Sequence, residues 1–310
     1  MSDRAHSATA ARAKEPNAYA LFEVELARAE TLSPHMARMT FVGPDVARMR
    51  TCAADQRIKV FFPRTPGGPV DIEDAADWYA HYKARDAAER PPMRTYTIRE
   101  LRPDALVLDF VLHGDGGPAS RWALAARPGD RLKMMVPDAA FPGDPGGYEW
   151  RPPAELADVL LIADETALPA LAGILESLAS RPHPPRTQAF VEIPGAADAL
   201  PAATWQGLEL TWLPRDGAEH GVRMIEALAS ARTPSAAATV EATPASDVDI
   251  DTELPWERAA TGAPGAGFYA WVAGESGAVM QVRRELVQVR GLDRRAINLM
   301  GYWRLGRVIE

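Results

Sequence analysis

The four residues Arg94, Thr95, Tyr96 and Thr97 (RTYT) combine side chains that could together hold a flavin. In a β-strand, positions two apart share a face, so Arg94 and Tyr96 can present a cation and an aromatic ring to one ligand. The cation would meet a pyrophosphate, the ring an isoalloxazine, and the Thr97 hydroxyl at the strand end would lie near a redox nitrogen. The same residues also fit an ordinary barrel strand with a surface arginine and a packed tyrosine, and the pattern alone leaves both interpretations open.

A glycine-rich turn from His113 to Ser120 (HGDGGPAS) lies between an apolar stretch and a helical one. Glycines let backbone N–H groups approach an anion closely, and the start of a helix favours negative charge. The turn can therefore bind a phosphate, with Ser120 as a further donor. The alternative is a flexible strand-to-helix turn that Ser120 caps, with His113 as a structural residue at the strand end.

A polar cluster, Asp164-Glu165-Thr166, comes directly after the apolar run 157–163 (ADVLLIA). Such a run indicates a strand buried on both faces of a parallel sheet, and open α/β sheets bind ligands at the carboxyl ends of their strands. The Gly-x-Gly-x-x-Gly fingerprint of dinucleotide sites does not occur here, and Asp164 or Thr166 could instead cap the next helix.

Two further loops, 273–276 (AGES) and 301–306 (GYWRLG), each follow an apolar strand near the end of the chain. We expect them at the same sheet edge as Asp164, although their aromatic residues could simply pack in the core. The first two segments therefore need a β-rich scaffold, and the last three need an α/β scaffold.

The elements that position these segments change character near residue 150. Residues 18–137 contain short strands separated by turn formers, which indicates an antiparallel barrel or sandwich with strands at 21–29, 36–42, 57–62, 94–100 and 105–113 and a helix at 117–126. The later part alternates, with strands at 157–163, 188–193, 208–213, 267–273 and 296–302 and helices at 168–179 and 278–289. We expect a β + α/β protein: an antiparallel β-barrel domain over 18–150 and an α/β domain with a mostly parallel sheet over 151–310, as in ferredoxin-NADP reductase-like enzymes.

Composition narrows the functional classes. The formal net charge of −8 argues against nucleic-acid binding, and no apolar run is long enough for a membrane span. The single cysteine, Cys52, excludes an intramolecular disulfide and a cysteine-based metal site, which fits the cytoplasm, and no metal ligands are expected. Residues 1–17 are polar and predict a disordered leader, and the Ala-, Thr- and Pro-rich stretch at 231–262 predicts a low-complexity insertion.

Seven segments, taken in order, resemble the siderophore-interacting protein family of FAD-dependent ferric-siderophore reductases. They are KVFFP (59–63), RTYTIR (94–99), DFVLHGDGGPASRW (109–122), PGD (128–130), ADETALPAL (163–171), AWVAGES (270–276) and GYWRLG (301–306). The resemblance implies an FAD-binding barrel followed by a domain for NADPH or NADH.

The resemblance also implies roles for matching positions. It implies that Arg94, Tyr96 and Thr97 hold the flavin phosphate, ring and N5 region, and that the backbone of His113 and Gly114 contacts the flavin ring or ribityl region. It places Ala119, Ser120 and Trp122 by the pyrophosphate or adenine side. Thr95 and Gly117 complete the implied FAD-binding residues. The implied contacts of the nicotinamide cofactor are Asp164, Glu165, Thr166, Gly274, Glu275 and Trp303. Basic residues beside the flavin would attract an anionic siderophore, and the positions for these are Lys59, Arg304 and Arg307. Ala163 departs from the family pattern, which often has glycine there.

The implied activity is electron transfer from NAD(P)H through FAD to siderophore-bound iron(III), with iron(II) released in the cytoplasm. The flavin would carry this chemistry, so no catalytic acid, base or nucleophile is expected. The expected partners are a ferric siderophore and, in one branch of the family, a ferredoxin-type donor; we expect a monomer without nucleic-acid or membrane partners. Two alternatives stay open: an NAD(P)H:flavin oxidoreductase with another electron acceptor, and a non-catalytic siderophore-binding protein.

Overall fold

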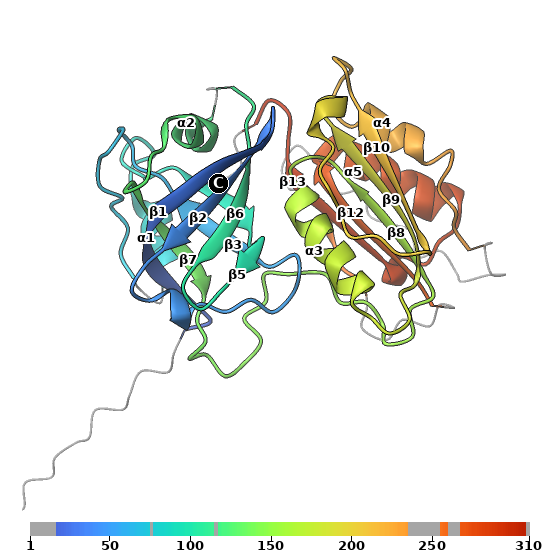
Figure 1. Cartoon of the computed structure of the whole chain (residues 1–310), viewed down its shortest axis with the longest axis horizontal. Helices are drawn as coiled ribbons and strands as arrows, with labels where there is room; N and C mark the ends of the chain where they lie inside the picture. The colour runs from blue at the N-terminus through green and yellow to red at the C-terminus, as the bar shows by residue number, and fades with distance from the viewer. Residues whose placement is uncertain (1–16, 75–76, 115–116, 235–254, 260–266, 308–310) are drawn as a thin grey trace, which may run out of the picture.

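The computed structural model describes residues 17–74, 77–114, 117–234, 255–259 and 267–307. Within these ranges the chain forms two sheets that lie side by side, each with its own core (Figure 1). The first is a seven-stranded antiparallel sheet in the order β4-β3-β7-β1-β2-β6-β5, and the second has six strands in the order β10-β9-β8-β12-β13-β11. The predicted β + α/β fold is confirmed.

The first sheet curls into a barrel because its two outermost strands, β4 and β5, follow each other directly in the chain. Alternate side chains such as Phe41 and Val60 point inward and form one apolar core. The strands are β1 (Tyr19–Ser33), β2 (Met36–Val42), β3 (Arg57–Phe61), β4 (Met93–Thr97), β5 (Glu100–Leu101), β6 (Leu106–Val111) and β7 (Arg131–Pro137).

Two helices accompany the barrel on different surfaces. Helix α2 (Pro118–Ala125) packs Ala119 and Ala123 onto the inner core. Helix α1 (Trp78–Ala84) lies on the outside, where Trp78 meets Phe61 of β3 edge-on at 5.6 Å. Segments carried by β3 and β4 therefore have one side toward the core and one side toward α1.

The second sheet has helices on both faces, which explains the continuous apolar runs of its strands. Helix α3 (Leu168–Ala179) covers one face, while α4 (Val222–Ala227) and α5 (Ser276–Arg283) cover the other (Figure 1). All strand pairs are parallel except that of β11 with β13. The strands are β8 (Asp158–Ala163), β9 (Arg186–Ile193), β10 (Leu208–Pro214), β11 (Trp256–Glu257), β12 (Phe268–Glu275) and β13 (Ile297–Trp303).

The remaining regular segments are short. Helix α5 continues as a π-helix over Arg284–Val289, and 3₁₀ turns lie at Val46–Arg48, Ala196–Asp198 and Arg294–Ala296. In the described part of the chain, no helix is both long and apolar enough to cross a membrane.

The sequence located the long elements better than the short ones. Strand 36–42 and helix 168–179 are confirmed to the residue, whereas α1, α4 and β11 were not predicted. Strand β11 lies inside the segment 231–262 that was expected to be a low-complexity insertion. Residues 235–254 and 260–262 of that segment, and 1–16 of the expected leader, lie outside the described residues. A two-residue edge strand is too short to show any periodicity, so only its partner β13 identifies it.

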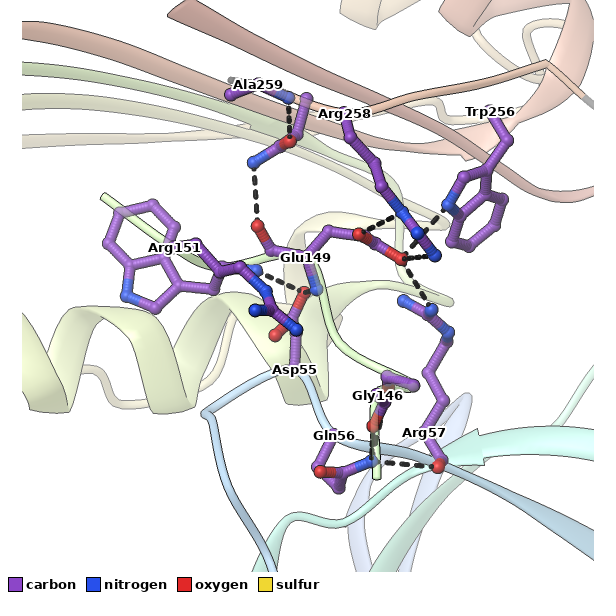
Figure 2. A network of polar contacts seen from close by, with 12 residues as sticks. Asp55, Gln56, Arg57, Gly146, Glu149, Arg151, Trp256, Arg258 and Ala259 are labelled. Carbon is purple, nitrogen blue, oxygen red and sulfur yellow. Dashed lines mark hydrogen bonds and ion pairs between the residues drawn. The ribbon is translucent and has the colours of Figure 1, made fainter. Parts of the chain in front are cut away.

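A buried polar network joins both sheets to the segment between them (Figure 2). The Glu149 carboxylate accepts hydrogen bonds from Arg57 of β3 (2.9 Å), from the Trp256 indole of β11 (3.1 Å) and from Arg258 (3.0 Å). The Asp55 carboxylate, just before β3, accepts the backbone N–H of Glu149 at 2.8 Å. Because breaking a buried charged pair is costly, this network holds the barrel and the parallel sheet in one arrangement.

Candidate cofactor site

Strands β3 and β4 present one surface inside the barrel and one outside. Arg94 and Tyr96 pair with Val60 and Ile58, whose side chains belong to the inner core. The Tyr96 ring lies 4.3 Å from that of Phe110, and burial raises the pKa of its hydroxyl. Arg94 and Tyr96 thus share a face, as the strand alternation predicted, and the tyrosine is anchored by an aromatic neighbour.

The outer surface carries Lys59, Thr95 and Thr97. Lys59 Nζ donates to Thr95 Oγ1 at 2.8 Å, and Thr97 is 6% exposed. Burial, followed by the charges of Arg57 and Lys83, lowers the pKa of Lys59. The two threonines of the RTYT segment therefore lie across the strand from the tyrosine ring.

At the glycine turn and the start of α2, the structure contradicts the interpretation that Ser120 caps the helix. The helix begins directly after Gly117, so Ser120 is not its cap. Its hydroxyl, in a residue 2% exposed, donates to the Val111 carbonyl at 3.1 Å and lies 3.2 Å from His113 Nδ1. Gly114 has φ +72° with open space where a Cβ would project, so its backbone is the accessible part of this turn.

Ala119 and Trp122 lie on the side of α2 that faces the barrel. Ala119 is buried in the core, while Trp122 stacks on Phe41 at 6.2 Å with 21° between the rings. Trp122 also lines a hollow of about 540 Å³ whose other walls include the loop 67–70 and the beginning of β7. Arg94, Tyr96 and Ser120 do not line this hollow, so it joins Trp122 to none of these three predicted cofactor residues.

At the edge of the second sheet, Asp164 binds three separate loops together. One carboxylate oxygen accepts from the Thr166 N–H (2.9 Å), and the other accepts from the Glu275 N–H (2.8 Å) and the Trp303 indole N–H (2.7 Å). A Cβ on Gly274 would lie 2.7 Å from this carboxylate, so only glycine fits there. The five residues meet as predicted, but α3 begins at Leu168 and Asp164 does not cap it. We call Asp164, Thr166, Gly274, Glu275 and Trp303 the Asp164 cluster.

The charge state of Asp164 depends on its surroundings. Burial, reinforced by the neighbouring Glu165, raises its pKa to about 7, against the hydrogen bonds from Thr166 and Trp303 that lower it. The residue is 1% exposed. Its proton can therefore be gained or lost near neutral pH at the sheet edge where the sequence predicted the nicotinamide cofactor.

Glu165, the next residue, is held by an arginine that the sequence did not single out. Arg215, 7% exposed, donates to both Glu165 oxygens at 2.6 Å and to Glu192 at 3.1 Å. Glu192 also accepts the Gly221 N–H at 2.8 Å ahead of α4. The available signal was Glu192 itself, a charged residue inside the apolar strand QAFVEI, because a buried charge requires a partner.

His220 completes this group from the same side. Its ring meets that of Trp303 edge-on at 4.9 Å, and one nitrogen lies within 4.8 Å of carboxylate oxygens of Glu165 and Glu192. The Arg215 guanidinium already donates to both carboxylates. The arrangement is therefore an ion-paired structural cluster, and a metal ion would have to displace Arg215 to use it.

The C-terminal basic residues follow β13. Arg304 and Arg307 form an isolated bridge in the turn after Trp303. Trp256 stacks on Tyr302 of β13 at 6.3 Å and lies 4.4 Å from the Arg57 guanidinium. Through Trp256, the end of β13 is therefore linked to Arg57 of β3. Arg57 lies two residues before Lys59 in the sequence. No contact between Lys59 and either C-terminal arginine is present in the described residues.

Two family models match the chain. The siderophore-interacting FAD-binding domain matches residues 25–141, and the siderophore-interacting protein model matches residues 156–306. The ferric vibriobactin reductase ViuB of Vibrio cholerae is 27% identical over 291 residues, which cover 92% of this chain and 89% of ViuB. The NADPH-dependent ferric-chelate reductase of Escherichia coli is 30% identical over 199 residues, which cover 63% of this chain and 71% of that protein.

Solved structures give the same result. A siderophore utilization protein from T. fusca has 28% identity and a TM-score of 0.70, with 95% of this chain and 96% of that chain covered. More distant structures with a TM-score of 0.56, a ferredoxin reductase among them, share the fold alone. The architecture is thus ferredoxin-reductase-like. With one family model on the barrel and the other on the parallel sheet, the chain belongs to the siderophore-interacting protein family.

Proposed function

We propose that the protein is a FAD-dependent reductase that uses NAD(P)H to reduce iron(III) held in a siderophore. The matching FAD-binding model and the names of the V. cholerae and E. coli relatives support this proposal. The structural observation that carries it is the common face of Arg94 and Tyr96, with Tyr96 packed on Phe110 of β6, the strand that leads into the glycine turn.

The barrel residues fit a flavin. Arg94 supplies a half-buried cation for a phosphate, and Tyr96, fixed against Phe110, supplies a ring on the same face. The backbone at Gly114 can approach a ligand because φ is +72° and, among the described residues beyond its chain neighbours, no atom lies within 4 Å of the position a Cβ would take. When bound, FAD supplies the exchange between two-electron and one-electron chemistry, and the protein supplies its position and surroundings.

The Asp164 cluster would serve the nicotinamide cofactor. It lies at the carboxyl edge of β8, β12 and β13, where open α/β sheets bind ligands. Asp164 fixes the Trp303 indole and the start of α5, so a cofactor at this edge would meet a rigid wall. The E. coli relative is NADPH-dependent, which favours NADPH as the donor.

Lys59 would attract the substrate. Ferric siderophores that are anionic would meet its amine on the outer surface of β3, despite the net charge of −8 for the whole chain. We assign the reaction to the cytoplasm because a chain with one cysteine, Cys52, cannot form the intramolecular disulfides that are common in proteins of oxidising compartments.

The deciding experiment is anaerobic absorbance spectroscopy of the FAD-loaded protein. NADPH or NADH should bleach the flavin, and a ferric siderophore should restore its colour as iron(II) appears in a chelator trap. Recovery with other acceptors but not with ferric chelates would identify a different oxidoreductase. A flavin that neither nicotinamide reduces would point to a redox-protein donor such as a ferredoxin, and a protein that takes up no FAD would be a siderophore-binding protein.

A further inference from the structure

Helix α3 lies between the parallel sheet and the barrel, and it presents one face to each (Figure 1). Ile174, Leu175 and Leu178 are buried in the core of the parallel sheet. Gly173 and Glu176 lie three positions apart, so they share another face of the helix, and both face the barrel. The sequence predicted this helix to the residue, whereas its second contact surface follows only from the fold.

Gly173 lets the helix come close to the barrel backbone. A Cβ at this position would lie 3.2 Å from the Ala54 carbonyl oxygen and 3.3 Å from the Ala54 Cβ, whereas ordinary contacts begin near 3.4 Å. Because Asp55, next to Ala54, accepts the backbone N–H of Glu149 at 2.8 Å, the loop at Ala54 is held in place. Glycine weakens a helix interior relative to alanine, so the close approach explains why glycine stands here.

One turn further along α3, Glu176 binds Arg99, which follows strand β4. Arg99 Nη1 donates to one Glu176 oxygen at 3.0 Å, and Nη2 donates to the other. On the barrel side, the Arg99 guanidinium lies 3.9 Å from the Asp109 carboxylate, which also pairs with Arg38 at 2.7 Å. Since a two-point contact between arginine and carboxylate fixes direction as well as distance, Arg99 holds α3 in one orientation on the barrel.

The two elements that this pair joins also carry the two predicted cofactor sites. Arg99 comes two residues after Thr97 of the RTYT segment, and α3 begins at Leu168, four residues after Asp164. A hydride that passes from a nicotinamide to a flavin oxidises the first and reduces the second by the same two electrons. It must cross about 3–3.5 Å, and a misplacement of about 1 Å can lower the rate about 100-fold. The arrangement of these two elements is therefore critical for the transfer.

We propose that Arg99, Gly173 and Glu176 are positioning residues for hydride transfer. The close approach at Gly173 sets the separation of the barrel and α3, and the Arg99–Glu176 pair sets the orientation of the RTYT strand relative to the Asp164 cluster. The Glu176 side chain is 50% exposed, so this ion pair contributes little to folding, and its loss should appear in the transfer rate. This role rests on the proposed function and adds residues outside both cofactor sites.

The test is anaerobic stopped-flow absorbance of the FAD-loaded full chain mixed with NADPH or NADH. In Arg99→Met and in Glu176→Met, flavin bleaching at saturating nicotinamide should slow about 10- to 100-fold. The flavin-to-protein ratio after dialysis and the nicotinamide concentration for half-maximal rate should stay unchanged. The double variant should be no slower than either single variant, because both remove the same contact. Arg102→Met is the matched control, since Arg102 pairs with Glu100 inside the barrel at 3.3 Å, and it should bleach like the parent.

A disulfide supplies a second readout. The separation of 3.3 Å between the Ala54 Cβ and a Cβ at position 173 is close to the roughly 3.5–4.5 Å that a disulfide spans. Ala54→Cys with Gly173→Cys, in a Cys52→Ser background, should therefore lock α3 to the barrel on mild oxidation. Thiol titration should show slower closure of this disulfide when Arg99→Met is added. Once closed, the disulfide should restore most of the bleaching rate that Arg99→Met had lost.

Two results would overturn the positioning role and leave the reductase proposal intact. One is bleaching in Arg99→Met as fast as in the parent, and the other is a loss of rate that the closed disulfide does not restore. A parent protein whose flavin is reduced by neither nicotinamide would instead refute the nicotinamide donor of the proposed function, and the positioning role with it.

Discussion

Replacing Gly274 by alanine tests whether the Asp164 cluster is as rigid as its hydrogen bonds indicate. The new Cβ would lie 2.7 Å from both the carboxyl carbon and one oxygen of Asp164, where ordinary contacts begin near 3.4 Å. Either the carboxylate or the end of β12 must therefore move by about 0.7 Å. The oxygen concerned accepts from the Glu275 N–H at 2.8 Å and the Trp303 indole at 2.7 Å, so such a shift disrupts at least one of these bonds.

The expected cost combines two effects. Overpacking in a dense interior costs about 1–3 kcal/mol, and a hydrogen bond to a charged group contributes about 1.5–3 kcal/mol. Because partial relaxation reduces their sum, we expect Gly274→Ala to lower the free energy of unfolding by about 3–4 kcal/mol. Urea denaturation followed by tryptophan fluorescence measures this change, and Trp303 itself should report altered surroundings in the native state.

The control is Gly129→Ala in the turn before β7. Gly129 has φ +99°, and no atom lies within 4 Å of the position that a Cβ would take, so its replacement isolates the backbone cost of a positive φ, about 1–2 kcal/mol. If Gly274→Ala costs no more than Gly129→Ala, the Asp164 carboxylate is free to move and the argument for a rigid wall at this edge is wrong.

Three further outcomes are expected. Arg215→Met should lower the free energy of unfolding by about 3–5 kcal/mol in urea denaturation, because Glu165 and Glu192 would be left buried without a counter-charge; a loss below about 1 kcal/mol would contradict the buried pair. Asp164 has a folded pKa of about 7 against 3.8 unfolded, so its contribution to stability is present below pH 3.8 and is lost as pH rises through about 7. Asp164→Asn should therefore flatten the dependence of unfolding free energy on pH in that window, and an unchanged slope would assign it to another group. Tyr96→Ala should weaken FAD retention about tenfold, measured as the flavin-to-protein absorbance ratio after dialysis, while Tyr96→Phe retains it; an unchanged ratio in the alanine variant would remove Tyr96 from the flavin site.

The local sequence pattern was sufficient to predict an element where that segment has its own hydrophobic period. The apolar run 157–163 predicted a strand buried on both faces, and helix 168–179 was located to the residue. Alternation alone placed Arg94 and Tyr96 on a common face, since side-chain direction in a strand follows from its period of two. The glycine turn was located as well, but its hydrogen bonds were not predicted. The Ser120 hydroxyl donates to a carbonyl of the preceding strand and does not cap the helix.

Long-range partners were decided by the sheet order. Asp164 was equally compatible with a helix cap, and only the adjacency of β8, β12 and β13 brings it to Trp303, 139 positions later in the chain. The same holds for Arg215, which meets Glu165 across 50 positions. Neither pairing leaves a periodic trace in the sequence.

The sequence by itself thus determined the two kinds of sheet, the family and the segments that carry polar chemistry, because these depend on local hydrophobic period and on glycine positions. Tertiary structure alone decided that Lys59 and Tyr96 lie on opposite faces of the β3–β4 pair, that α1 holds Tyr79 beside Lys83, and that β11 completes the second sheet. The physical reason is that burial and electrostatic neighbours are properties of packed surfaces, and such surfaces are assembled from residues far apart in the chain.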